Sequence, residues 1–253
     1  MAERRLTMRK RSDAIATLVD ELNELRLFGM AASLEDLYHS SDFNALDRIS
    51  FLQRLIEPEY EAKTSLRYKN RLKRAHLTGG PQEYNSCHDS TERKYLPEGI
   101  TDTLGTLNFI SDGLNICILG PSDSGKSYLA KALSIKACLH YRVGYYHCES
   151  FLEEMVALKL RDFQTYQKQI RYNINLDLLI LDDFLLHTIT DEREIKVLFE
   201  VMEKRSELSK STVVCSQREP NSWASMILND EVSSNAIMKR ATKHYTVVIQ
   251  PKS

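Results

Sequence analysis

The spacing of apolar residues changes once along the chain. In the N-terminal part they recur at three- and four-residue intervals, as at Ile15, Leu18 and Leu22, a period that is typical of amphipathic helices. Gly29 interrupts this pattern. We therefore expect a small all-helical domain over residues 1–77. Its helical stretches are 13–38, with the break at Gly29, then 44–54, and a further helix that starts at Glu57.

From residue 101 onward, short apolar runs alternate with helical stretches. This alternation is typical of a parallel sheet with crossover helices. The expected fold class is α/β, with a five-stranded parallel sheet in a domain over residues 101–253. Residues 78–100 contain glycine and proline breaks with little periodicity and are expected to be a linker. The expected strands are Ile116–Leu119, Val143–Cys148, Leu176–Asp183, Ser211–Gln217 and His244–Gln250.

Polar residues predict where two of the helices begin. Ser150, followed three residues later by Glu153, has the spacing of a capping box. Thr190 precedes a stretch with acids in its first turn, so it is expected to cap a helix over 191–208.

Composition narrows the class of protein. The 253 residues are 42% hydrophobic and 27% charged, with a net charge of −1, as in a soluble globular protein. No apolar run approaches the roughly 18 residues that span a bilayer, and the basic N-terminus is followed by an amphipathic pattern instead of an apolar signal core. The five cysteines form no C-x-x-C pair, which favours reduced packing thiols. A cytoplasmic protein without a membrane partner is expected.

The first strand leads into a glycine-rich loop. Gly120, Gly125, Lys126 and Ser127 have the spacing Gly-x-x-x-x-Gly-Lys-Ser, between an apolar run and an amphipathic helix. In that context backbone N–H groups surround a polyphosphate, the lysine contacts its β- and γ-phosphates, and the serine hydroxyl suits Mg²⁺. The alternative is a glycine turn before an ordinary helix. The residues expected to bind ATP are Gly120, Pro121, Ser122, Asp123, Ser124, Gly125, Lys126, Ser127 and Tyr128.

Asp123 stands where such loops often have glycine. Aspartate tolerates left-handed backbone torsions better than most residues, so the shape of the loop is expected to survive. Its charge is expected to lower nucleotide affinity unless the carboxylate points to solvent.

Two strand ends supply further polar groups. Ligands of open α/β sheets bind beyond the carboxyl ends of the strands, where Asp182 and Asp183 follow an apolar run. We expect Asp182 to hold Mg²⁺ and Asp183 to activate the water that attacks the γ-phosphate; the alternative is a pair of acids capping a turn. Ser216 or Gln217, at the next strand end, is expected to contact the γ-phosphate or that water, or simply solvent.

A basic run closes the N-terminal helical stretch. Six basic residues follow three acids from Glu57 onward, more than complementing a helix dipole requires. With Arg4, Arg5 and the basic residues 9–11 they suit a phosphate-contacting surface, and a merely solvated face is the alternative. The residues expected to contact DNA are Lys63, Arg67, Arg71, Lys73 and Arg74.

These parts, in this order, resemble one family over nearly the whole chain. GPSDSGKS, LLILDD, the strand-end Ser-Gln and the helical preface with Glu57 and Glu59 are similar to the IstB-like transposition ATPases. Those proteins are relatives of the DnaC-type helicase loaders in the AAA+ class. The resemblance implies a P-loop AAA+ core that lacks a helical lid, and ATP- and Mg²⁺-dependent hydrolysis. It also implies homo-oligomers on double-stranded DNA, with the ATP site at the subunit interface, and delivery of target DNA to a partner transposase.

The resemblance also implies roles for two arginines and one departure. Arg240, in AIMKRATKHYTVVI, would be an arginine finger that acts on a neighbouring subunit; a surface charge is the alternative. Lys239 stands where the family has aspartate and, with Asp123, bears on hydrolysis more than on binding. Arg205 matches a family arginine without an assigned role.

Three other functions compete with this one. A DnaC-like helicase loader shares the core and would copurify with a hexameric helicase. A P-loop kinase for a small substrate fits less well with the paired acids and the helical preface. A DNA-binding module that retains ATP only structurally would release no phosphate.

Overall fold

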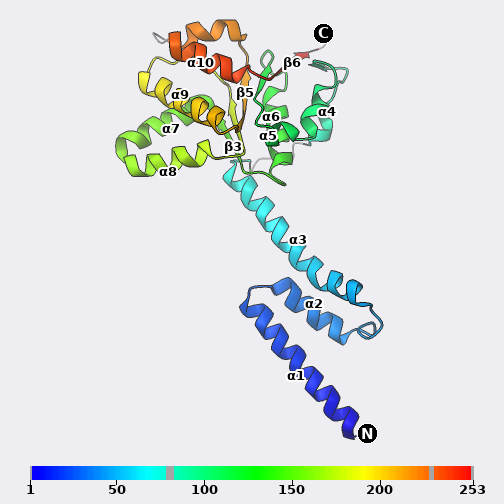
Figure 1. Cartoon of the computed structure of the whole chain (residues 1–253). Coiled ribbons are helices and arrows are strands. Elements are labelled where there is room, and N and C mark those ends of the chain that lie inside the picture. Colours follow the sequence, from blue (N-terminus) through cyan, green and yellow to red (C-terminus); the bar gives the residue numbers. More distant parts are fainter. Residues whose placement is uncertain (1, 78–82, 228–230, 252–253) are drawn as a thin grey trace. The chain divides into compact units, whose positions relative to one another are not determined.

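The computed structural model describes residues 2–77, 83–227 and 231–251, with side chains from residue 12 onward. The chain divides into two compact units, Met1–Asn70 and Arg71–Ser253 (Figure 1). None of the helices in the described ranges is long and apolar enough to cross a membrane.

The first unit is helical, as expected. It contains α1 (Ala2–Glu24), α2 (Phe28–His39) and the larger part of α3 (Arg48–Arg74). The sequence predicted two helices where α3 is one, and Pro58 lies inside it. A proline removes one main-chain donor from a helix, and Glu59, next to Pro58, is held by contacts to another helix.

Glu59 joins α3 to the start of α2. Its Oε2 accepts hydrogen bonds from the N–H groups of Gly29 at 2.6 Å and Met30 at 3.4 Å. These donors belong to the first turn of α2 and have no partner within that helix. A Cβ added to Gly29 would lie 2.8 Å from the Glu59 Cα, so this close approach requires glycine. Gly29 therefore marks a helix–helix contact as well as a break.

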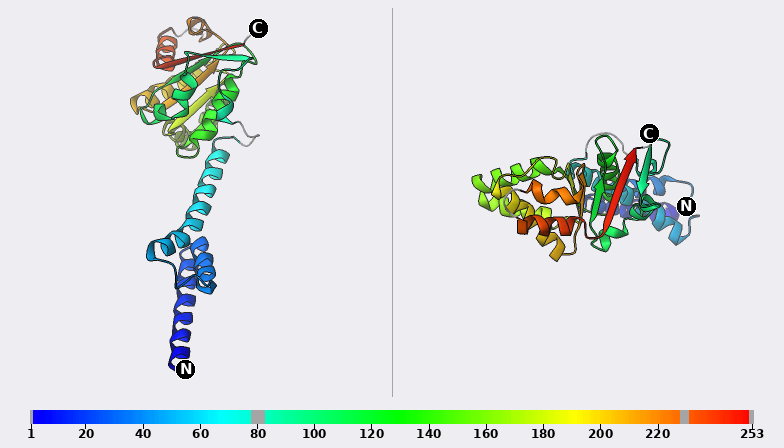
Figure 2. Two further views of the ribbon diagram at one scale, coloured as in Figure 1. Left: turned by 90° about the vertical axis from the view of Figure 1, so that its right-hand side faces the viewer. Right: turned by 90° about the horizontal axis from the view of Figure 1, so that it is seen from above.

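The second unit contains a six-stranded sheet with the order β1-β6-β2-β5-β4-β3. Five strands are parallel, as predicted, and β1 pairs antiparallel with β6 (Figure 2). The prediction of a linker over residues 78–100 is thus wrong for its second half, whereas residues 78–82 lie outside the described residues. Only Tyr95 of β1 is buried, so four residues carry no period-two signal. The strands are β1 (Arg93–Leu96), β2 (Ile116–Leu119), β3 (Val143–His147), β4 (Leu178–Asp182), β5 (Ser211–Ser216) and β6 (Tyr245–Pro251).

Helices cover both faces of the sheet. The side chains of Cys117, Leu179 and Val214 share a core with helices α7 to α10, and the alternate residues of the strands face the other side, where α6 packs against β3, β4 and β5. All five cysteines are buried and free, as expected for packing thiols. The helices are η1 (Tyr84–Ser86), α4 (Ile100–Gly105), α5 (Asn108–Ser111), α6 (Lys126–Ala137), α7 (Cys148–Arg161), α8 (Phe163–Ile174), α9 (Glu192–Glu207), η2 (Pro220–Met226) and α10 (Glu231–Ala241).

Both predicted cap residues are displaced. Helix α7 begins at Cys148, directly after β3, so Ser150 lies inside it and the capping box with Glu153 does not form. Helix α9 is capped by Asp191, whose carboxylate accepts a hydrogen bond from the Arg193 N–H at 2.8 Å, and not by Thr190. A carboxylate adds a favourable charge at the positive end of the helix.

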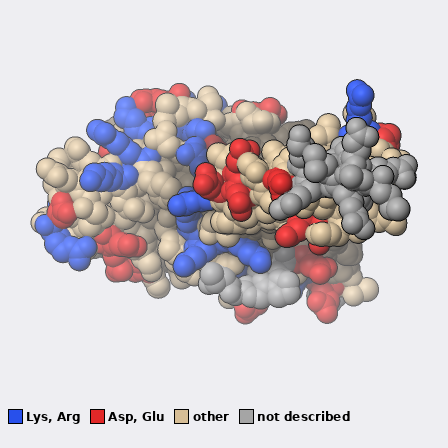
Figure 3. Space-filling view, turned by 90° about the horizontal axis from the view of Figure 1, so that it is seen from below, with Lys and Arg blue, Asp and Glu red and all other residues tan. Residues whose placement is uncertain are grey.

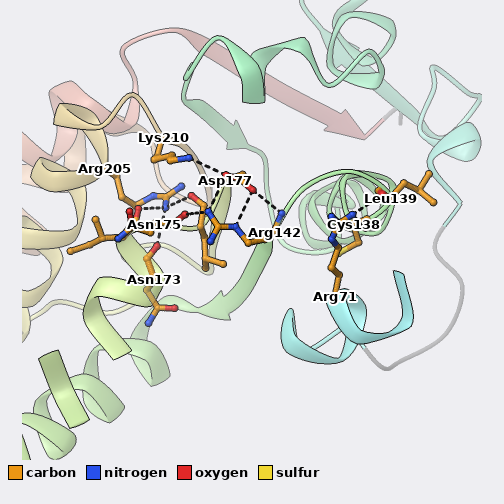
Figure 4. Close-up of polar contacts among 11 residues, drawn as sticks. Arg71, Cys138, Leu139, Arg142, Asn173, Asn175, Asp177, Arg205 and Lys210 are labelled. Atoms are coloured by element: carbon orange, nitrogen blue, oxygen red, sulfur yellow. Dashed lines mark hydrogen bonds and ion pairs between the residues drawn. The ribbon is translucent and has the colours of Figure 1, made fainter. Parts of the chain in front are cut away.

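Arg205 is the largest charged side chain in the core. It projects from α9, is completely buried, and its burial lowers its pKa to about 9, so it stays charged at neutral pH. Nearby Asp177 opposes that shift and pairs with Lys210 at 3.0 Å. The guanidinium bonds to backbone around the end of α8 and the start of β5 (Figure 4). Its acceptors are the carbonyls of Asn173 at 2.9 Å, Ile174 at 3.0 Å, Leu176 at 2.9 Å and Ser211, and the Thr212 hydroxyl at 3.0 Å.

Replacing Arg205 is expected to destabilise the fold strongly. In Arg205→Met the carbonyls that end α8 lose their donor while they remain buried, which costs about 3–5 kcal/mol of the unfolding free energy. Urea denaturation followed by circular dichroism measures the loss. Lys204→Met changes the neighbouring exposed residue, which pairs with Glu207, and is expected to leave the midpoint unchanged. Equal midpoints for the two variants would contradict the role given to Arg205.

Candidate nucleotide-binding site

One cleft collects residues from three strand ends. It has a cavity volume of about 330 Å³, at the lower end of the range of small-molecule sites. The glycine-rich loop forms one wall, and Asp183 after β4 and Gln217 after β5 complete the lining. The parallel register explains this convergence, because Leu119 pairs with Ser216 and Leu181 with Val214. The loop residues in the lining are Ser122, Asp123, Gly125, Lys126, Ser127 and Tyr128.

The two motif glycines meet different steric demands. A Cβ on Gly120 would lie 2.6 Å from the Ser124 Oγ and 2.7 Å from the Ile249 carbonyl oxygen. Gly125 has φ +100° and stands at the N-cap of α6. Asp123 also has a left-handed φ of 59° and is exposed, as the sequence led us to expect for its backbone. Any side chain at position 120 would therefore prevent this shape of the loop.

Two buried polar side chains of the loop are not fully hydrogen-bonded. The Ser124 hydroxyl is buried and has no hydrogen-bond partner among the described residues. The Lys126 ammonium donates to the Pro121 carbonyl at 2.6 Å. Burial lowers the pKa of Lys126, and the carboxylates of Asp182 and Asp183 act against that shift. A buried cation and a free hydroxyl beside backbone N–H groups at a helix start fit a phosphate chain.

Asp182 is held by donors on two sides. It is fully buried, and its Oδ2 accepts a hydrogen bond from the Tyr145 hydroxyl of β3, while its Oδ1 accepts one from the Asp183 N–H at 3.0 Å. Burial, and then the Asp182 charge, raises the pKa of Tyr145. Tyr145 therefore stays a hydroxyl donor, and the Asp182 carboxylate is fixed in orientation.

Asp183 is directed into the cleft by its backbone and by a histidine. Its φ is 51°, and its Oδ2 lies 3.2 Å from the Nδ1 of His147. His147 ends β3 and pairs in register with Asp182. Sequence reasoning missed both Tyr145 and His147. The signal was the Tyr-x-His spacing at the end of β3. This spacing has a meaning only once the strand order is known, because β3 then lies next to β4.

The two candidates after β5 have different surroundings. The Ser216 hydroxyl is buried, donates to the Phe184 carbonyl at 2.8 Å and accepts from the Arg218 N–H at 3.2 Å. It serves the backbone between β4 and β5 and does not line the cleft, so the expectation of a catalytic Ser216 is corrected. Gln217 is the residue of this pair that lines it.

Arg240 does not line the cleft of its own chain. It lies on α10, forms an ion pair with Glu203 of α9, and its Nη1 donates to the Ala236 carbonyl at 2.9 Å. Its guanidinium is 5.8 Å from the centre of the Phe199 ring. The neighbouring Lys239 is exposed. An action of Arg240 on another subunit stays a prediction.

The basic residues of α3 differ in availability. Arg71 is engaged, because its Nη1 donates to the carbonyls of Cys138 at 3.2 Å and Leu139 at 2.7 Å, after the end of α6 (Figure 4). Its expected DNA contact is corrected to a structural one. Lys63 pairs with Glu59 at 3.1 Å.

Four cations of the basic run remain exposed and form no ion pair within the described chain: Arg67, Lys69, Lys73 and Arg74. Residues 9–11 lie outside the described side chains. Acidic groups are interspersed with the basic ones on the face that Figure 3 shows. Because Lys63 and Arg71 are engaged, any DNA surface on α3 has fewer free cations than the six-residue basic run contains.

The residues at the strand ends fit a magnesium ion. The Ser127 hydroxyl and the oxygens of Asp182 and Asp183 are hard donors of the kind that Mg²⁺ prefers. One oxygen of each acid and a ring nitrogen of His147 lie within 4.8 Å of one another. Because both Asp182 oxygens already accept hydrogen bonds, this acid is suited to hold the ion through water.

The fold and the cleft together define a P-loop nucleotide-binding protein of the AAA+ class. Residues 20–253 match the family described as IstB-like ATP binding protein, and the chain belongs to that family. It is 30% identical over 222 residues to the insertion sequence ATP-binding protein y4pL of Sinorhizobium fredii, covering 88% of each chain. It is 27% identical over 237 residues to the ATP-binding protein of insertion sequence IS232 from Bacillus thuringiensis, covering 91% of this chain and 90% of that protein.

A solved structure of the DnaC helicase loader has the same core fold. It superposes with a TM-score of 0.51 at 17% identity, covering 67% of this chain and 97% of that one. At this level of identity the likeness supports the AAA+ fold. The sequence-based assignments of family and fold class are confirmed, apart from the additional antiparallel strand.

Removing the Lys126 charge is expected to weaken ATP binding. Lys126→Ala deletes a charge-assisted contact to phosphate worth about 1.5–3 kcal/mol, a roughly 10- to 150-fold loss of affinity. Fluorescence anisotropy with a labelled ATP analogue measures it. Lys168→Ala, on exposed α8 surface, is the control and should bind like the parent. Unchanged affinity in Lys126→Ala would show that the nucleotide binds elsewhere.

Proposed function

We propose that this protein hydrolyses ATP with Mg²⁺, assembles on double-stranded DNA and delivers a target site to a partner transposase. The observation that carries the hydrolytic part is the meeting of Lys126, Asp183 and Gln217 in one cleft. A cation for the phosphates, a carboxylate for the attacking water and an amide to orient it are the groups that phosphoryl transfer to water requires.

Asp183 is the residue that activates water in this proposal. Asp183 has a left-handed backbone and lines the cleft together with Lys126, and the contact with His147 restricts the rotation of its carboxylate. The carboxylate accepts a proton or a hydrogen bond from water as the bond to the γ-phosphate forms. Gln217 can donate its amide N–H to the same water or to the phosphate.

Ser127 and Asp182 are the residues proposed to hold Mg²⁺, the serine through its hydroxyl and the aspartate through water. Bound there, the ion supplies charge neutralisation on the β- and γ-phosphates. The Tyr145 hydroxyl keeps the Asp182 carboxylate in its orientation and thereby keeps the ion site shaped.

Assembly is proposed because Arg240 does not line the cleft of its own subunit. Arg240 forms an ion pair with Glu203 and does not line its own cleft, so in this proposal it serves a neighbouring subunit. An arginine that reaches a γ-phosphate in trans couples hydrolysis to oligomerisation. The ion pair with Glu203 would then open as subunits meet.

The DNA and transposase parts rest on relatives and on charge. The relatives are ATP-binding proteins of insertion sequences, where the DNA-rearranging partner would be a transposase. Arg67, Lys73 and Arg74 are exposed cations suited to duplex phosphates. Helicase loading is the alternative function. The fold shared with the DnaC helicase loader favours it, and copurification with a helicase would identify it.

Asp183→Asn is expected to separate binding from turnover. The amide keeps the shape of the side chain but cannot accept a proton, so phosphate release should fall about 10²- to 10⁴-fold while ATP affinity is kept. Light scattering should show that the ATP-dependent assembly persists. Asp112→Asn alters an exposed acid and should leave phosphate release unchanged. Parental turnover in Asp183→Asn would rule out its proposed role.

Removing three of the exposed cations of α3 is expected to weaken duplex binding. In the triple variant Arg67→Ala, Lys73→Ala, Arg74→Ala, fewer counterions are released, so the slope of log affinity against log salt should decrease by about 2.7. Electrophoretic mobility shifts across a salt series give the slope. A triple variant of Lys168, Lys196 and Lys243, which are exposed elsewhere, is the control. Equal slopes for both triple variants would remove α3 from the DNA surface.

A further inference from the structure

The segment from η1 to β1 packs beside the glycine-rich loop and α6. The Ser86 hydroxyl lies 2.7 Å from the Tyr128 hydroxyl, one residue beyond Ser127. The Lys136 ammonium stands 4.9 Å from the centre of the Tyr84 ring. Strand β1 then joins the sheet beside β6. A stretch that the sequence presented as a linker is therefore packed along α6, the helix that carries the phosphate-binding lysine.

Arg93, at the start of β1, lies directly over the loop. A Cβ built on Gly125 would be 2.8 Å from the Arg93 Nη1 and 3.3 Å from its Cζ. Gly125 lines the cleft and precedes Lys126, so the guanidinium stands at the edge of the phosphate cradle. The absence of a side chain at Gly125 makes this approach possible.

No carboxylate of the described residues forms an ion pair with Arg93. Two other groups lie near its charge, the Cys87 thiol and the Tyr95 hydroxyl, and the hydroxyl is hydrogen-bonded to the Arg93 side chain. Burial raises the pKa of Cys87 to about 11 and raises the pKa of Tyr95 as well. Both are neutral at pH 7, so the guanidinium charge is not compensated by its neighbours and is available to an anion.

The charge balance of the cleft favours such a cation. Lys126 is influenced by three acids, Asp123, Asp182 and Asp183. A loop with one cation and three carboxylates repels a triphosphate unless further positive charge is present. Mg²⁺ would offset the two strand-end acids, and Arg93 is the nearby protein cation that can offset the acid within the loop.

We propose that Arg93 binds the phosphate chain of the nucleotide held by its own subunit. The inference rests on nucleotide binding at the glycine-rich loop. A guanidinium presents paired N–H donors to phosphate oxygens, and pairing of β1 with β6 fixes the backbone position of Arg93. Arg93 thus adds a second cation from a strand outside the motif. Its charge offsets that of Asp123, which stands where such loops usually have a neutral residue.

The test compares Arg93→Gln with Lys94→Gln on the same strand, whose side chain points to the opposite face. Titrations with ATP, ADP and adenosine are followed by isothermal calorimetry, with thermal unfolding of each unliganded variant. Arg93→Gln is expected to lose about 10- to 100-fold in ATP affinity and nothing in adenosine affinity. Arg93→Lys should recover part of the loss, and Lys94→Gln should match the parent.

Three outcomes overturn the proposal. Parental ATP affinity in Arg93→Gln, together with loss of binding in Lys126→Ala, refutes Arg93 and leaves the loop as the site. An equal loss for ATP and adenosine, with a lower melting temperature, means that Arg93 only supports the packing of the loop. Equal losses in Arg93→Gln and Lys94→Gln mean that the general charge of β1 is responsible. If Lys126→Ala also binds ATP normally, the site itself is wrong.

Discussion

The parallel pairing of β2, β5 and β4 is the constraint on which the site depends. Each strand ends at the same edge of the sheet, so the loop after β2, Gln217 after β5 and Asp183 after β4 converge although they are far apart in sequence. Buried strands of this kind tolerate no change of register, because a shift of one residue would exchange the two faces of the core. The geometry of the cleft is thus a consequence of hydrophobic packing.

Arg205 binds the backbone where β4 and β5 begin, at the ends of these strands that lie away from the nucleotide cleft. The carbonyls at the end of α8 have no donor within the helix, and the start of β5 lies beside them. One buried guanidinium satisfies both sets, which fixes where β4 and β5 begin. Since strand starts determine strand ends, a residue remote from the nucleotide contributes to the position of Asp183.

Electrostatics shapes the cleft as strongly as sterics does. Asp182 is buried with the Tyr145 hydroxyl as donor, Asp183 is oriented by His147, and Lys126 lies close to both. Such a group of acids is suited to a metal and to water activation but opposes a triphosphate. In our proposal the positive charge of Arg93, which lies beside Gly125, offsets the repulsion between these acids and the phosphates. In this proposal a residue of β1 contributes to phosphate binding, whereas the residue that activates water follows β4.

The sequence alone determined the loop, the acid pair, the five parallel strands and the helical character of the N-terminal unit. Each of these is encoded within a few neighbouring residues, through glycine spacing, apolar runs or helical periodicity. Only the tertiary structure decided that Ser216 and Arg71 serve backbone carbonyls, that Tyr145 and His147 hold the two acids, and that β1 brings Arg93 to Gly125. Hydrogen-bond partners of this kind belong to segments brought together by strand order and helix packing, and local patterns carry no information about which distant segment arrives.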